Sequence, residues 1–141
     1  MEAKVTWHRN VSFVAESGSG HSTLVDGAPE HGGQNIGPRP MELILMGLGS
    51  CASFDVITIL KKQRQTVSGC ECSVRGDRAN SVPSVFINAH LEFKILGTNL
   101  DVKKVEHAVN LAIEKYCSAS KMFEDAGIEL KHEVTIVDVP S

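Results

Sequence analysis

The sequence lacks an excess of basic residues: its 141 residues include 14 Lys and Arg against 17 Asp and Glu, for a formal net charge of −3. The basic residues are scattered along the chain and form no dense run. A protein of this charge has no electrostatic reason to bind nucleic acid or an anionic membrane surface. We therefore expect neither nucleic acid nor a membrane as a partner.

The N-terminus lacks the pattern of a secretory signal. Residues 1–7 read M-E-A-K-V-T-W, with no apolar run followed by small residues. We therefore expect the protein to stay in the reducing cytoplasm, where its four cysteines are thiols and not disulfides. The cysteine spacing gives no zinc pattern, and His21, His31 and His132 have no mutual spacing typical of metal ligands. We expect no bound metal.

The chain also lacks an uncharged stretch long enough to span a bilayer. Glu42 and Asp55 limit the charge-free part of its longest apolar stretch to well below the roughly 20 residues that a bilayer requires. Residues 43–54 are apolar on nearly every side, which is typical of a helix surrounded by protein. Pro40 suits a first helical position. The pattern predicts one long core helix within residues 37–65.

The remaining patterns predict a single α+β domain over residues 1–141, and no internal repeat is present. Before the helix, β-branched and aromatic residues at 5–13 and 21–25 predict an antiparallel β-meander of two or three strands. After it, alternating apolar and polar residues at 70–75 and 85–95 predict a β-hairpin.

Two helices and a strand are expected to complete the domain. Asp101 is a plausible cap for the first of these helices. Around Cys117 the helical phase changes, and a short helix ends at Gly127, a good residue just after a helix. A strand at 129–137 follows. The buried face of the first helix is predicted to consist of Val102, Val105, Val109, Ala112, Ile113 and Tyr116.

Cys51, within the predicted core helix, and Cys117, just before the last helix, are the candidate reactive residues. Free cysteine is often buried, so passive packing is the simpler interpretation of Cys51. Gly47 and Gly49 instead suggest space near its sulfur, because glycine in a helix costs roughly 1 kcal/mol relative to alanine. Cys117 has the electrostatic advantage, since unpaired N–H groups at a helix start stabilise a thiolate. The residues alone do not decide between them.

The element order and three motifs resemble the OsmC/Ohr family, and in particular its YhfA-like branch, over nearly the whole chain. The motifs are G-H-x-x-x-x-D-G at 20–27, P-x-E-L-I-x-x-x-x-x-S-C at 40–51 and K-Y-C-S-x-S at 115–120. The resemblance implies an OsmC-like fold and an intertwined homodimer with the thiols at the subunit interface. It implies no cofactor.

The resemblance also implies an activity, that of a thiol-dependent hydroperoxide reductase. In peroxidase members of the family, the helix cysteine attacks a hydroperoxide and becomes a sulfenic acid. A second cysteine resolves this acid to a disulfide, which small dithiols reduce. Cys51 and Cys117 occupy those two positions.

The chain departs from the peroxidase pattern at the groups that hold the thiolate. Met41 stands where peroxidase members generally have glutamate, and Glu42 lies about 100° further around the helix. Arg39 is twelve residues from Cys51, roughly 18 Å along the axis. It could reach the thiol only from the other subunit, or Arg9 could serve. Arg39 and Glu42 are candidate substrate-binding residues, and we expect weak activity.

A competing prediction comes from a different functional class. The chain could form a non-catalytic OsmC-like dimer that binds a small apolar ligand at its interface, with Cys51 and Cys117 inert. The amino-acid composition does not distinguish this prediction from the prediction of a peroxidase. Cys70 and Cys72 share one face of a predicted strand, where we expect them to be structural.

Overall fold

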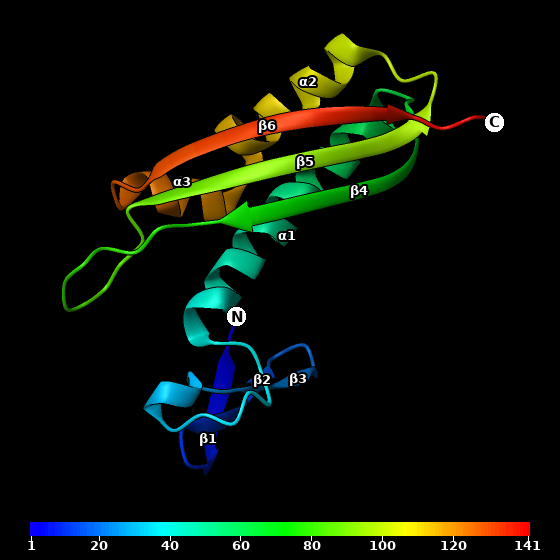
Figure 1. Ribbon diagram of the computed structural model, residues 1–141. Coiled ribbons are helices and arrows are strands. Elements are labelled where there is room, and N and C mark those ends of the chain that lie inside the picture. The colour runs from blue at the N-terminus through cyan, green and yellow to red at the C-terminus, as the bar shows by residue number, and fades with distance from the viewer. The chain divides into compact units, whose positions relative to one another are not determined.

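The computed structural model describes residues 1–141, which form two compact units, Met1–Ile44 and Leu45–Ser141 (Figure 1). The elements occur in the predicted order: a β-meander, a long helix, a pair of antiparallel strands, two helices and a final strand. The α+β class predicted from the sequence is therefore confirmed.

The first unit is built on an antiparallel sheet of three strands, β1 (Ala3–Arg9), β2 (Ser12–Ser17) and β3 (Ser22–Val25), in that order. Val25 is its single buried apolar side chain, whereas Trp7 is 67% exposed. A sheet with so little buried apolar surface does not offset the conformational entropy lost on folding. The first unit therefore has no adequate core within one chain.

A buried carboxylate organises the loop that follows β3. Asp26 is only 2% exposed. One of its oxygens accepts a hydrogen bond from the Gly27 N–H (2.8 Å), and the other accepts from the N–H groups of Gln34 (2.8 Å) and Ile36 (3.3 Å). The loop, including its 3₁₀ turn η1 (Pro29–His31), is thus closed around one side chain. These bonds satisfy backbone donors that would otherwise lack partners.

The second unit contains a sheet in the order β4 (Thr66–Arg75), β5 (Asn88–Thr98) and β6 (Glu129–Asp138). β4 and β5 are antiparallel, as the sequence predicts, and β5 and β6 are parallel. Val85 and Ile87 precede β5 and are about half-exposed. The sequence analysis therefore placed the start of this alternating apolar and polar strand too early. Within β5 the buried apolar side chains are Ala89, Leu91, Phe93 and Ile95.

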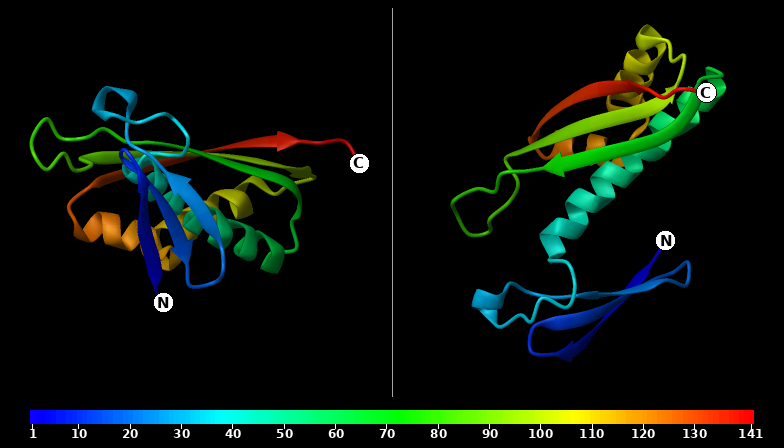
Figure 2. Two further views of the ribbon diagram at one scale, coloured as in Figure 1. Left: turned by 90° about the horizontal axis from the view of Figure 1, so that it is seen from below. Right: turned by 45° about the vertical axis from the view of Figure 1, so that its right-hand side comes forward.

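Helices cover one face of this sheet, as Figures 1 and 2 show. They are the part of α1 (Pro40–Lys62) that lies in the second unit, α2 (Val102–Leu111) and α3 (Ser118–Asp125). Asp101 caps α2 as predicted, because its side chain accepts from the Lys104 N–H. Of the buried face predicted for this helix, Val102 and Tyr116 are wrong, since both are about half-exposed.

α1 begins at Pro40, as predicted, and packs on the second unit with one stripe of side chains. The stripe recurs every four residues and is fully buried: Leu48, Ala52, Val56 and Leu60. Other apolar positions are not covered, and Phe54 is 72% exposed. The most apolar part of α1 has the mean hydropathy of a membrane helix, 2.0, yet only 28% of it is buried. One chain alone therefore leaves much of α1 uncovered, and the expected cover by a second chain stays a prediction.

The Asp26 carboxylate should make the first unit acid-sensitive. The N–H groups, that of Gln34 above all, hold its pKa below the ordinary value of 3.8, and Arg39 adds to this effect. A lowered folded pKa stabilises the protein above the unfolded value, and this contribution is lost as the pH falls through the folded pKa. We expect Asp26→Asn to unfold at a lower urea concentration at neutral pH and to lose less stability on acidification.

The fluorescence of Trp7, the only tryptophan, reports on this unit directly. Glu30→Gln, an exposed carboxylate in the same loop, is the matched control and should behave like the parent. Equal unfolding midpoints for Asp26→Asn and the parent at neutral pH would contradict the assignment.

Candidate functional site

Three side chains that can ligate or react meet inside the second unit. The sulfurs of Cys51 and Cys117 and a carboxylate oxygen of Asp55 all lie within 4.8 Å of one another. The structure therefore brings together the two cysteines that the sequence singled out, although 66 residues separate them in the chain. Asp55 was not predicted as a member of the site.

α1 contributes two members of the cluster, Cys51 and Asp55. Residues four apart on a helix lie on the same face, so these two side chains project together. Ala52 and Val56, each the next residue along, are fully buried. Their burial fixes the rotation of the helix about its axis and thereby the direction of the thiol and the carboxylate. The spacing C-x-x-x-D was the sequence signal for Asp55.

Cys117 is positioned by an irregular turn between α2 and α3. The chain passes through the π-helical turn η2 (Ala112–Tyr116), and the Cys117 N–H donates to the Ala112 carbonyl at 2.8 Å. π turns widen a helix and often occur at functional sites. At the next residue α3 begins, and the Cys117 sulfur accepts a hydrogen bond from the Ser120 N–H at 3.3 Å. The turn thus explains the predicted change of phase.

Burial decides the electrostatics of Cys117. Its side chain is only 2% exposed, and burial raises its pKa. The hydroxyl and N–H groups of Ser120 act in the opposite direction, whereas the neighbouring Cys51 raises the pKa further. The prediction that the helix start lowers the pKa of Cys117 is wrong, because desolvation outweighs the helix N–H groups.

Asp55 brings a third acidic group to the cluster without a balancing cation. Burial raises its pKa, and no basic side chain counteracts the effect. None of the five ion pairs of the chain involves this residue. Nor does any basic group act on the pKa of Cys117. The site therefore holds three groups that can each become negative and no positive side chain that offsets them.

The two glycines near Cys51 differ in their surroundings. A Cβ on Gly49 would lie 2.7 Å from Cγ2 of Val74 on β4, so this glycine permits close packing of helix and sheet. A Cβ on Gly47 would meet nothing within 4 Å, and the residue is exposed. Gly49 therefore serves close packing, and the expectation of room for a ligand beside the sulfur stays a prediction at Gly47.

Cys70 and Cys72 lie together on one face of β4, as expected. Both are half-buried, and the Ser53 hydroxyl lies close to both sulfurs. Burial raises the pKa of Cys72 to about 11. A thiol with such a pKa is a poor nucleophile at neutral pH, because the thiolate is the reactive form.

Arg39 and Glu42, the predicted substrate-binding residues, make local hydrogen bonds within the first unit. The Glu42 carboxylate accepts from the Arg39 N–H at 2.8 Å, which satisfies a backbone donor at the start of α1. The Arg39 guanidinium donates to the Asn35 side chain (3.0 Å) and to the Gly37 carbonyl (3.1 Å). Their substrate-binding role stays a prediction.

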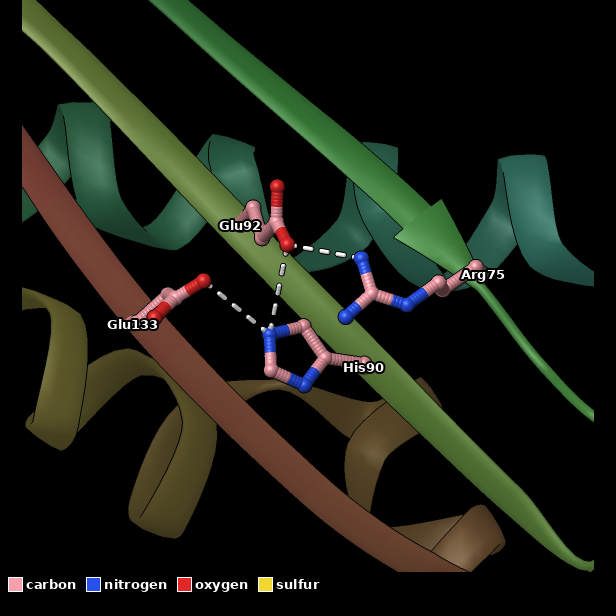
Figure 3. Close-up of polar contacts among 4 residues, drawn as sticks. All are labelled: Arg75, His90, Glu92 and Glu133. Atoms are coloured by element: carbon pink, nitrogen blue, oxygen red, sulfur yellow. Dashed lines mark hydrogen bonds and ion pairs between the residues drawn. The ribbon is translucent and has the colours of Figure 1, made fainter.

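A second polar cluster lies on the opposite face of the sheet from the helices (Figure 3). The His90 ring is 3.3 Å from the Glu133 carboxylate and 3.6 Å from that of Glu92. Arg75 forms an ion pair with Glu92 at 2.7 Å and thereby lowers the pKa of that carboxyl. The guanidinium already neutralises one carboxylate, so we interpret the cluster as an exposed cross-strand network of modest stabilising effect.

The exposure of the thiols predicts the order in which they react with iodoacetamide. Cys51 is partly exposed, Cys117 is buried, and Cys72, with a pKa of about 11, has roughly one thiolate per ten thousand molecules at pH 7. We expect Cys51 to be alkylated first in the native protein. Peptide mass mapping during the reaction measures the order, with unfolded protein as the control. Modification of Cys117 before Cys51 would contradict it.

Comparison with known proteins bears on the family of the chain and not on the roles of the site residues. A family model described as OsmC-like protein matches residues 32–133. The protein YhfA of Escherichia coli strain K12 is 39% identical over 137 residues, which cover 97% of this chain and 98% of YhfA.

Solved structures extend the comparison to the fold. A hypothetical protein from Aquifex aeolicus VF5 is 28% identical, with a TM-score of 0.80 and 97% of each chain covered. The organic hydroperoxide resistance protein OhrB of Bacillus subtilis is 22% identical, with a TM-score of 0.64 over 96% of this chain and 98% of that one. This last likeness shows the fold alone. With the family model and the YhfA match, these likenesses confirm the predicted resemblance: the chain belongs to the OsmC/Ohr family, in its YhfA-like branch.

Proposed function

We propose that the protein is a thiol-dependent hydroperoxide reductase in which Cys51 is the attacking thiol and Cys117 the resolving thiol. The proximity of their two sulfurs in the reduced chain carries the proposal. The name of OhrB, an organic hydroperoxide resistance protein of the same fold, indicates the class of substrate. The substrates are then an organic hydroperoxide and a small dithiol, in a reducing cytoplasm.

The difference in exposure supports this division of roles. The Cys51 thiolate, partly exposed, attacks the terminal oxygen of the hydroperoxide. The O–O bond breaks, the alcohol leaves and Cys51 becomes a sulfenic acid. The buried Cys117 then attacks the Cys51 sulfur, so that an S–S bond forms and water is released. A dithiol reduces this disulfide by exchange and is itself oxidised.

The surroundings of the thiols favour a slow reaction with hydroperoxides. A carboxylate such as that of Asp55 disfavours a neighbouring thiolate, because like charges repel. The sequence also has Met41 where the peroxidase pattern has a glutamate, so an arginine brought to the sulfur would lack that partner. The loss of one charge-assisted contact of about 1.5–3 kcal/mol slows a reaction by one to two orders of magnitude if it acts in the transition state.

The functional unit in this proposal is a homodimer in which the 141 residues of each chain form one OsmC-like domain. The large exposed apolar side chains support it, with Phe54 on α1 and Trp7 on β1 each more than 60% exposed. The first unit in particular has almost no core of its own. A second copy of the chain would cover these side chains and could supply Arg39 to the thiols of its partner.

Cysteine variants test the assignment of roles. We expect Cys51→Ser to abolish consumption of an organic hydroperoxide, because the attacking sulfur is gone. Cys117→Ser should react once and stop at a sulfenic acid, which dimedone labels and intact mass detects. Cys70→Ser, a thiol outside the cluster, is the control and should turn over normally. Turnover in Cys51→Ser with a labelled Cys117 would reverse the assignment.

The dimer makes a separate prediction about stability. If the apolar surfaces are covered by a second copy, dissociation and unfolding should occur together, and the unfolding midpoint should rise with protein concentration. Sedimentation at micromolar concentration, combined with Trp7 fluorescence during urea unfolding, measures both. A folded monomer would contradict the proposal.

The alternative, binding of a small apolar ligand, is supported by a different feature. A hollow of about 430 Å³ lies along α1, with Phe54, Ile57 and Cys70 among the residues that line it. Its lining includes neither Cys51 nor Cys117. A protein that consumes no hydroperoxide, but whose Phe54→Ala variant loses affinity for an apolar fluorescent probe, would favour this second function.

A further inference from the structure

The thiol cluster has the composition of a metal site as well as that of a redox pair. Its members are two sulfurs and one carboxylate, contributed by α1 and by the turn before α3. We propose that Cys51, Asp55 and Cys117 bind Zn²⁺ when both thiols are reduced. Binding would release the thiol protons and leave two thiolates and one carboxylate around the ion.

The donor set favours zinc over the harder divalent cations. Thiolates are soft ligands that select zinc and similar metals, whereas Mg²⁺ and Ca²⁺ take oxygen ligands. Three protein ligands leave the fourth tetrahedral position of Zn²⁺ to water. The partial exposure of Cys51 gives solvent access to that position.

The spacing of the donor atoms is close to what the ion requires. Bond lengths of about 2.0–2.3 Å place the ligand atoms of a tetrahedral Zn²⁺ roughly 3.3–3.8 Å apart. The donor atoms of Cys51, Asp55 and Cys117 already lie within 4.8 Å of one another without a metal. Shifts of roughly 1–1.5 Å at most would bring them to the tetrahedral spacing.

Charge and hydrogen bonding at the site also favour the binding of Zn²⁺. No basic side chain balances Asp55 or Cys117, and a dication would neutralise the negative charge that develops there. The Ser120 hydroxyl is completely buried and has no partner with standard hydrogen-bond geometry, although it acts on the neighbouring Cys117 thiol. With the Ser120 N–H, which donates to the sulfur at 3.3 Å, it would support a metal-bound thiolate as an outer-shell donor.

Zinc binding does not depend on the proposed peroxidase activity, although it uses the same thiols. A disulfide between Cys51 and Cys117 would remove two of the three ligands, so metal and disulfide exclude each other. A protein without peroxidase activity can therefore bind zinc, and a peroxidase can fail to bind it.

Titration of the reduced, full-length protein with Zn²⁺ against a chromophoric chelator tests the inference. We expect one Zn²⁺ per chain, and none after the thiols are oxidised to the disulfide. Asp55→Asn should weaken binding by at least about tenfold, because a neutral amide is a poorer zinc ligand than a carboxylate.

The chain offers a matched pair of variants, since each retains two of the four thiols. Cys51→Ser/Cys117→Ser should lose zinc binding, whereas Cys70→Ser/Cys72→Ser should keep it. A second measurement uses the parent protein and needs no variant to fold. Zn²⁺ should protect Cys51 from iodoacetamide in peptide mapping and leave the reaction of Cys70 unchanged.

Three results would overturn the inference. They are absence of stoichiometric binding by the reduced parent, retention of zinc by Cys51→Ser/Cys117→Ser, and equal affinities for Asp55→Asn and the parent. Loss of binding in Cys70→Ser/Cys72→Ser with protection of Cys70 would instead place the metal on β4.

Discussion

The burial of one stripe of α1 against the second unit determines the direction of every chemically active group on that helix. Leu48, Ala52, Val56 and Leu60 are completely buried, and rotation of the helix would expose them at a cost of about 1.5–3 kcal/mol for each large side chain. Gly49 permits the close approach of α1 to Val74. With the helix held in this way, Cys51 and Asp55 project together toward Cys117, the residue just before α3.

The parts that the sequence predicted correctly depend on local patterns. The start of α1 at Pro40 and the cap at Asp101 follow from backbone chemistry within a few residues. The C-x-x-x-D spacing indicates that Asp55 lies on the same helix face as Cys51, but it could not reveal Asp55 as a partner of Cys117. That role requires Cys117 to reach the same face of α1 through a π turn. A π turn differs from an α-helical turn by about one extra residue, and this difference leaves little signal in the amino-acid composition.

The prediction about Cys117 failed for a related reason. A helix start lowers a thiol pKa through N–H groups that are local and readable in the sequence. Desolvation depends on side chains brought in from other elements, and at 2% exposure it decides the direction of the shift. The sequence likewise does not reveal which elements cover Phe54. This side chain is exposed in one chain, so an apolar helix need not be covered by its own chain.

The anionic character of the cluster bears on both proposals, peroxide reduction and zinc binding. A thiolate beside Asp55 is costly unless a cation approaches, since no basic side chain of the cluster compensates it. An arginine from a second copy would reduce this cost and favour attack on a peroxide, whereas Zn²⁺ would reduce it further and occupy the sulfur lone pairs that attack requires. If both proposals hold, the cation that neutralises Asp55 would decide whether Cys51 acts as a nucleophile or as a ligand.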